Sequence, residues 1–310
     1  MDPDQIVFEM GYVVIASDSL CSTIWSITGN MLGLIGSPLT RIVRLFKISW
    51  QDQGMIWFAC IHDGDLEYNE MYINALKSAI KQTTLAPYLI YDGSNTAFIA
   101  TVTKLGATVI KHTFSLTNTN YFKRQNPGWQ RIARGTYLRL DIPMICQNID
   151  FYDTYALYTD VDILFLTNPV PTLEKYKPAF LAGCPETDPT NWSYINAGVL
   201  LLNIDSMYET YIPFMKCVND TLDIPGYDQT VLNKFYIDKI DRLPVIFNYK
   251  PYWGINPETS IIHYHGPKPS EIKAYLASGK SNPHYMHLFS MVSKDTWSKF
   301  LGYYTFYQTK

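Results

Sequence analysis

Short apolar runs alternate with helically spaced segments along the chain from Met55 onward. Met55–Ile61, Ala86–Tyr91 and Ala107–Ile110 have the length and composition of buried strands. Between them, Tyr68–Ile80 and Thr96–Leu105 carry apolar residues at helical intervals. Strands that alternate with helices predict a mostly parallel sheet with helices on both faces, so the fold class is α/β.

The second half of the chain continues this pattern. Further strands are expected in the run from Tyr155 to Asp160, in Tyr194–Asn203, in Leu243–Phe247 and in Ser260–Tyr264. Helical spacing is found over Arg131–Ile142, over Met207–Leu222, from about Thr230, and in an aromatic C-terminal helix over roughly Tyr285–Tyr304. Residues 111–130 are polar and rich in turn residues, so we expect a long loop that could act as a lid.

The first 53 residues differ in character from the rest. Between Glu9 and Arg41 the only charged residue is Asp18, but polar residues interrupt the apolar ones too often for a membrane-spanning helix. Arg41–Trp50 is a basic amphipathic stretch, which fits either an anionic membrane surface or an ordinary helix packed on the main domain. We therefore expect a helical N-terminal extension (1–53), a main α/β domain (54–270) and a C-terminal helical tail (271–310).

Composition and charge argue against several classes of protein. With 47% hydrophobic and 17% charged residues, the chain is expected to be globular rather than disordered. A net charge of −3 without a long basic run argues against nucleic acid as a partner. The cysteines form no Cys-x-x-Cys pair and the chain begins with acidic residues, which indicates a cytoplasmic protein with reduced thiols and at most peripheral membrane contact.

The most informative polar residues end the central apolar run. Asp160 and Asp162 are separated by one residue, so extended backbone would point both carboxylates to the same face. Two buried like charges are unfavourable unless a cation neutralises them, and oxygen ligands favour Mg²⁺ or Mn²⁺, which commonly bridge to phosphates. A solvated turn after the strand explains the same two residues, and Asp63 belongs to a second Asp-x-Asp sequence.

Other candidate residues also have a structural interpretation. His263 and His265 share one strand face just before Gly266–Lys268, which fits a metal- and phosphate-binding strand end, although a lone histidine there is more often structural. Arg139 could lie on a solvated cationic helix face, and Asp228 could be a helix N-cap. Taken singly, these residues leave both interpretations open.

Five short motifs occur in an order that resembles the retaining glycosyltransferases of family 8, the glycogenin and lipopolysaccharide-galactosyltransferase group. The motifs, which lie within a match from about Met55 to Lys268, are Thr136–Leu140, Tyr158–Ile163, Asn196–Leu200, Tyr227–Asn233 and His263–Lys268. The resemblance implies a GT-A-type, Rossmann-like fold with a mostly parallel mixed sheet, and residues 54–270 would then be a catalytic domain. It also implies transfer of a sugar from a nucleotide sugar, usually linked to UDP, to a hydroxyl acceptor on a glycan, a lipid-linked glycan or a protein.

The resemblance implies a role for the residues around the metal. Asp160, Asp162 and His263 match the ligands of Mn²⁺ (or Mg²⁺), which holds the diphosphate of the donor. Gly266 and Lys268 match residues that contact phosphate, although the lysine follows the glycine one residue sooner than in most members.

The same resemblance implies residues that contact the donor. Arg139 matches a basic residue near the diphosphate, Asn196 an asparagine near the transferred sugar, and Asp63 the strand-end acid that meets the nucleoside. Asp228 and Gln229 match the pair beneath the anomeric carbon, where either could act as a weak nucleophile or an electrostatic stabiliser.

The mechanism that these roles imply is electrostatic. Departure of the sugar leaves negative charge on phosphate, which the metal, Lys268 and Arg139 would stabilise, and positive charge on the anomeric carbon. Three alternatives remain at this stage: a nucleotidyltransferase or phosphohydrolase with the same metal pair, a non-catalytic nucleotide-sugar-binding protein, and a zinc enzyme built on the two histidines.

Overall fold

The structure is a computed structural model that describes residues 7–9, 12–14, 54–64, 66–117, 127–149, 151, 153–221 and 227–309. The chain divides into two units, Met1–Gln51 and Asp52–Lys310. In the first unit, β1 (Val7–Glu9) pairs antiparallel with β2 (Tyr12–Val14), so its described parts are strands and not the expected helix. The amphipathic stretch over residues 41–50 lies outside the described residues. Among the described helices, none has the length and apolar character that crossing a bilayer requires.

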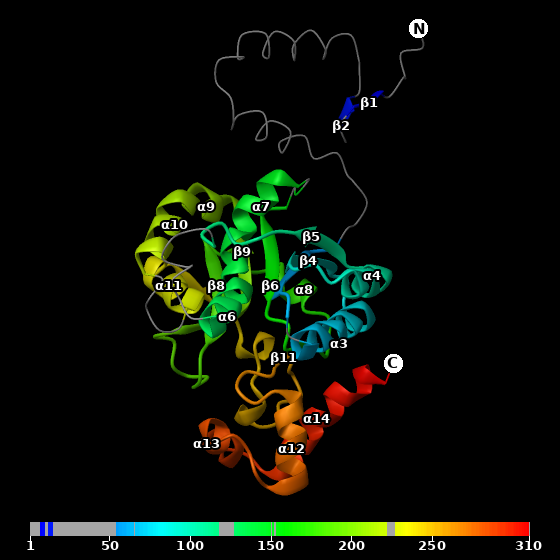
Figure 1. Ribbon diagram of the computed structural model, residues 1–310. Helices are drawn as coiled ribbons and strands as arrows, with labels where there is room; N and C mark the ends of the chain where they lie inside the picture. The colour runs from blue at the N-terminus through cyan, green and yellow to red at the C-terminus, as the bar shows by residue number, and fades with distance from the viewer. Residues whose placement is uncertain are drawn as a thin grey trace. The chain divides into compact units, whose positions relative to one another are not determined.

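A seven-stranded sheet forms the centre of the second unit, with the strand order β10-β8-β9-β6-β3-β4-β5 (Figure 1). Its strands are β3 (Ile56–His62), β4 (Ala86–Asp92), β5 (Thr108–Lys111), β6 (Tyr155–Thr159), β8 (Leu181–Pro185), β9 (Ile195–Asn203) and β10 (Ile240–Arg242). Strand β9 runs antiparallel to β6 and β8, while the other neighbouring pairs are parallel. The predicted α/β fold with a mostly parallel mixed sheet is confirmed.

Helices cover both faces of this sheet because successive side chains of each strand point in opposite directions. Phe58 and Cys60 of β3 join the apolar cluster on one face, and Trp57 and Ala59 join the cluster on the other. Helices on the first face are α6 (Pro127–Tyr137), α7 (Ile142–Asn148), α9 (Ile204–Glu209), α10 (Tyr211–Asp220) and α11 (Tyr227–Phe235). Helices on the second face are α3 (Leu66–Gln82), α4 (Thr96–Lys104) and α8 (Val170–Leu173). Figure 1 shows α9–α11 and α3–α4 on opposite sides of the sheet.

A smaller two-stranded sheet and the C-terminal helices form a third apolar cluster. Strand β7 (Ile163–Phe165) pairs antiparallel with β11 (Ile261–His263). The helical elements that follow are α12 (Pro269–Ser278), η4 (Pro283–Tyr285), α13 (Met286–Ser290) and α14 (Lys294–Gln308). The predicted tail boundary at residue 270 therefore falls inside α12. Tyr264, which follows β11, connects this strand to the cluster because its hydroxyl donates a hydrogen bond to the carbonyl of Phe300.

Several predicted elements differ in the structure, and proline explains two of the differences. The strand expected over Leu243–Phe247 is not formed: β10 ends before it, at Arg242, and after Pro244 the chain enters the 3-10 turn η2 (Val245–Phe247). The helix expected over Arg131–Ile142 starts at Pro127, and it breaks at the 3-10 turn η1 (Leu138–Asp141) before α7, whose Pro143 has no N–H to continue the ladder. The expected C-terminal helix is divided between α13 and α14. Residues 118–126 of the expected lid lie outside the described residues.

Candidate active site

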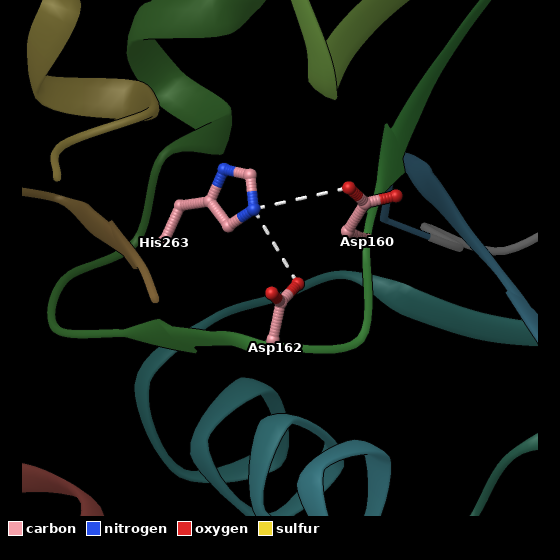
Figure 2. Close-up of side chains that lie close together, drawn as sticks. All are labelled: Asp160, Asp162 and His263. Carbon is pink, nitrogen blue, oxygen red and sulfur yellow. Dashed lines mark ion pairs between the residues drawn. The ribbon is translucent and has the colours of Figure 1, made fainter. Parts of the chain in front are cut away.

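Asp160, Asp162 and His263 converge where β6 leads into β7 and where β11 ends (Figure 2). The Nε2 atom of His263 lies 3.4 Å from Oδ1 of Asp162 and 3.8 Å from Oδ2 of Asp160. The amide of Asp160 donates to the carbonyl of Gly198 in β9, which fixes the start of the loop that carries both acids. Antiparallel pairing sets His263 opposite Ile163, so the β7–β11 sheet brings the histidine to the two carboxylates.

These three side chains fit a hard divalent ion. Each offers one ligand atom, and these atoms lie within 4.8 Å of one another. Burial lowers the pKa of His263, so its imidazole is neutral and able to donate an electron pair near pH 7. Two carboxylate oxygens and one imidazole nitrogen suit Mn²⁺ and also accommodate Mg²⁺.

His265, the second histidine of a possible zinc site, faces a different set of partners. Its Nε2 lies 3.0 Å from Oε1 of Glu186, and its Nδ1 lies 2.8 Å from the hydroxyl of Tyr252. Among the described residues, the one group of side chains arranged to hold a metal contains His263 without His265. The geometry therefore argues against a zinc centre built on both histidines.

Arg139 lies beneath the metal trio and not on a solvated helix face. Its side chain is only 7% exposed, in the turn η1 between α6 and α7. Nη2 lies 3.0 Å from Oδ1 of Asp160, Nε lies 2.9 Å from Oδ2 of Asp228, and Nη1 donates to the carbonyl of Ala197 at 2.6 Å. The guanidinium also covers the ring of Tyr158. One buried cation thus neutralises the metal carboxylate and the carboxylate of α11.

Lys268 reaches the metal site directly. Its ammonium contacts Oδ2 of Asp162, the oxygen that does not face His263. Although burial opposes ionisation of Asp162, the charge of Lys268 and the contact with His263 hold the pKa of its carboxyl well below the usual range. The left-handed turn at Gly266, with φ +83°, redirects the chain between β11 and this lysine. With the short Gly–Lys spacing of this chain, the ammonium still reaches a metal-ligand candidate.

Asp228 is buried and lies inside α11, which begins at Tyr227, so it is not the N-cap of that helix. Burial raises the pKa of its carboxyl to about 6, although the charge of Arg139 acts in the opposite direction. Its Oδ2 receives no aligned hydrogen bond, because the Nε–H of Arg139 points to the carbonyl of Thr136. A buried carboxylate oxygen without a donor is available to stabilise positive charge on a bound substrate.

Gln229 and Asn196 are held by a residue that the sequence did not single out. Oε2 of Glu186 accepts hydrogen bonds from Nδ2 of Asn196 at 2.7 Å and from Nε2 of Gln229 at 2.9 Å. Oε1 of Gln229 in turn accepts from the amide of Ala197 at 2.8 Å. Burial disfavours ionisation of Glu186, but its contacts with His265 lower the pKa of its carboxyl to about 2.

One sequence signal could have identified two further site residues. Glu186 follows directly after β8, and ligands of open α/β sheets bind beyond the carboxyl ends of strands. Asn248, which also contacts the site, stands directly after the strand expected over Leu243–Phe247 and carried the same signal, although in the structure it follows the turn η2. The backbone pairing of the neighbouring Tyr249 with β11 brings this asparagine to His263.

Asp63 lies away from the metal trio, at the end of β3. Its carboxylate accepts hydrogen bonds from the amides of Ser94 at 2.9 Å and Gly64 at 3.2 Å. The amide of Ser94 is the largest influence that lowers the pKa of this carboxyl. The structure therefore places Asp63 in a turn between the ends of β3 and β4, with no contact to the other candidate residues among those described.

A cavity of about 400 Å³ lies next to Glu186 and Lys268. Glu186, His265 and Lys268 line it from the site already described, and His284, Tyr285 and Leu288 line it from η4 and α13. Its walls combine hydrogen-bonding groups with aromatic faces.

No family profile matches the sequence, and no curated protein matches it. Solved structures similar to it include the glycosyltransferase GlyE from Streptococcus pneumoniae TIGR4, with a TM-score of 0.54 and 18% identity over 80% of this chain. The chain spans 63% of the length of GlyE. The galactosyltransferase LgtC, solved with donor and acceptor sugar analogues, has a TM-score of 0.55 and 18% identity over 80% of this chain and 95% of its own.

Mouse xyloside xylosyltransferase 1 is a third similar structure, with a TM-score of 0.51 and 13% identity over 70% of this chain and 99% of its own. Identities of this size establish a shared fold. The seven-stranded mixed sheet, with its Asp-x-Asp loop at the end of β6, therefore has the GT-A architecture of these glycosyltransferases, as the order of the motifs had implied.

Proposed function

We propose that this protein is a metal-dependent retaining glycosyltransferase that moves a sugar from a UDP-linked donor to a hydroxyl group, with Mn²⁺ as its metal. The observation that carries the proposal is the convergence of Asp160, Asp162 and His263 on one side of a buried charge network. That network contains Arg139, a cation near the leaving group, and Asp228, a carboxylate near the anomeric carbon. The GT-A fold of the chain supports the same function.

The residues of the site can stabilise both charges that develop as the bond between sugar and diphosphate breaks: negative charge on the diphosphate and positive charge on the anomeric carbon. A bound divalent ion supplies Lewis-acid stabilisation of the diphosphate leaving group. Lys268 and Arg139 are the nearby cations, and carboxylates hold both in place. Oδ2 of Asp228 pairs with Arg139 but accepts no hydrogen bond, so it suits a positively charged anomeric carbon, while Gln229 is already engaged with Ala197 and Glu186. We therefore assign the electrostatic role at the anomeric carbon to Asp228.

The cavity beside Glu186 is the proposed entry for the acceptor. It adjoins the amide network of Asn196 and Gln229 through Glu186, and it adjoins the metal site through Lys268. Histidine and tyrosine side chains in its wall can hydrogen bond to hydroxyl groups and pack against the C–H faces of a sugar. A glycan acceptor matches this lining better than an apolar one.

A screen of UDP-sugars tests the proposal most directly. Purified protein with Mn²⁺ is incubated with each UDP-sugar, and released UDP and the anomer of the sugar product are measured. We expect one or a few donors to be hydrolysed slowly in a metal-dependent reaction with retained configuration. Release of pyrophosphate from a nucleoside triphosphate and a sugar phosphate would instead favour a nucleotidyltransferase, and tight UDP binding without turnover of any donor would favour a binding protein.

The pH dependence of the reaction should report the ionisation of Asp228. Burial raises the pKa of this carboxyl to about 6, so the group is ionised at pH 7.5 and becomes protonated as the pH falls through 6. Because the ionised form is the one that stabilises positive charge, kcat/KM for the donor should fall about tenfold per pH unit below that value. The measurement is a pH profile at saturating Mn²⁺, and the small residual rate of Asp228→Asn should lack this limb. A profile that stays flat from pH 7.5 to 5 would contradict the assigned role.

A further inference from the structure

Asn248 is a fully buried residue that contacts both His263 and Asn196. Its Oδ1 lies 2.8 Å from Nδ1 of His263, and its Nδ2 donates to Oδ1 of Asn196 at 2.8 Å. A single side-chain amide therefore contacts the metal-ligand candidate of β11 and the sugar-binding candidate of β9.

The orientation of this amide follows from its neighbours. The side-chain atom of Asn196 that faces Asn248 also accepts a hydrogen bond from the amide of Gly198 at 3.0 Å, so this atom is the oxygen Oδ1. Its second neighbour, in Asn248, must therefore also be a donor. The group of Asn248 that faces Asn196 is therefore the NH₂, and its carbonyl oxygen faces His263.

That orientation selects one tautomer of His263. A side-chain carbonyl can only accept, so Nδ1 of the imidazole carries the proton and Nε2 keeps its lone pair. Nε2 is the atom that faces Asp160 and Asp162. The ring is also confined on its other side, because a Cβ added at Gly198 would lie 2.2 Å from Cε1 of His263.

We propose that Asn248 is a positioning residue that aims Nε2 of His263 at the metal ion and, through its NH₂ group, ties the metal site to Asn196. Asn196 continues the connection to Glu186, which also holds Gln229. The metal site and the donor-sugar site are thus joined by side-chain hydrogen bonds through one buried amide. The proposal rests on the metal site of the proposed function, but it is tested by metal binding alone.

The test compares Mn²⁺ binding, followed by electron paramagnetic resonance of the free ion, in the wild type and three variants. Asn248→Ser removes both hydrogen bonds, and its dissociation constant for Mn²⁺ should rise about 10- to 100-fold. Asn248→Asp keeps an acceptor for Nδ1–H and should bind Mn²⁺ at least as tightly as the wild type, while losing the bond to Asn196. Asn203→Ser is the matched control, since Asn203 is a buried asparagine that donates to the carbonyl of Pro178 and caps α9.

Nitrogen-15 shifts of His263 provide a readout that general destabilisation would not change. Nδ1 should be protonated in the metal-free wild type and in Asn203→Ser, whereas Asn248→Ser should show a mixture of tautomers. If Asn248→Ser does not fold, weakened Mn²⁺ binding by Asn248→Asp overturns the proposal, and unchanged or tighter binding supports it.

The outcomes separate this inference from the proposed function. A wild-type protein that binds no Mn²⁺ would overturn both the metal site and the role of Asn248. A wild type that binds Mn²⁺, together with a folded Asn248→Ser variant of equal affinity, would overturn only the role of Asn248. Equal losses of affinity in Asn248→Ser and Asn203→Ser would likewise show that the effect is one of stability.

Discussion

Replacing Asp160 and Asp162 together with asparagine is expected to abolish metal binding and to reduce UDP-sugar turnover by more than about 10³-fold. A single electrostatic stabiliser at a developing charge is worth about 10²–10³ in kcat, and this change removes two anionic ligands at once. Asparagine keeps the shape of each side chain, so the loss would arise from charge and not from packing. Both Mn²⁺ affinity and turnover of the best donor from the UDP-sugar screen are to be measured.

Thermal unfolding provides a readout of the same variant that does not depend on turnover. A ligand that binds only the folded state stabilises it in proportion to the logarithm of its concentration over Kd. Mn²⁺ with UDP should therefore raise the Tm of the wild type and leave that of the double variant unchanged. Asp295→Asn, at an exposed position in the first turn of α14, is the control and should keep the full shift. Unchanged Mn²⁺ dependence in the double variant would disprove the proposed function.

Arg139→Met is expected to cause the largest loss of stability. The substitution leaves Asp160 and Asp228 without the buried cation that lies about midway between them in the network. Removal of one partner of a buried ion pair costs about 3–5 kcal/mol, because the remaining charge stays in a poorly solvated place. Urea unfolding at pH 8 measures this loss of unfolding free energy, and activity should be lost as well.

The same variant should recover stability as the pH falls. Burial raises the pKa of Asp228 even in the presence of Arg139, whose charge lowers it, so loss of the guanidinium raises that pKa further. Below this higher pKa the carboxyl of the folded variant is neutral, and its desolvation penalty disappears. The difference from the wild type should therefore be smaller at pH 5.5 than at pH 8. Arg242→Met, which removes an exposed arginine stacked on Trp192, is the control and should change the unfolding free energy by less than about 0.5 kcal/mol at either pH. A pH-independent deficit in Arg139→Met would contradict the burial argument.

Local patterns in the sequence were sufficient to predict the helix and sheet layers of the fold and to identify Asp160 and Asp162 as candidate site residues. Apolar runs that alternate with helical spacing identified β3, β4, β5, β6 and β9 to within one or two residues. Asp160 and Asp162 were singled out because they end the central apolar run, and in the structure they follow β6. The signal is local because a strand shows its period and its end within a few residues.

Some element boundaries could not be read from apolar periodicity. Pro244 separates β10 from a 3-10 turn that is as apolar as a strand, and η1 interrupts a helix whose apolar spacing continues through it. A 3-10 turn and a strand can carry the same apolar residues, so composition does not distinguish them.

By itself, the sequence determined an α/β chain with an Asp-x-Asp loop after its central strand, together with the residue types suited to a divalent ion and a diphosphate. The resemblance implied that Asp160, Asp162 and His263 share one metal, but residue patterns without it do not say which of these residues meet, and there the tertiary structure decided. Pairing of β7 with β11 brings His263 to the two acids, the same packing places Asn248 and Glu186 among the site residues, and it leaves Asp63 and His265 with other partners. The physical reason is that periodicity acts over a few neighbouring residues, whereas contacts between strand ends depend on the order and direction of strands far apart in the chain.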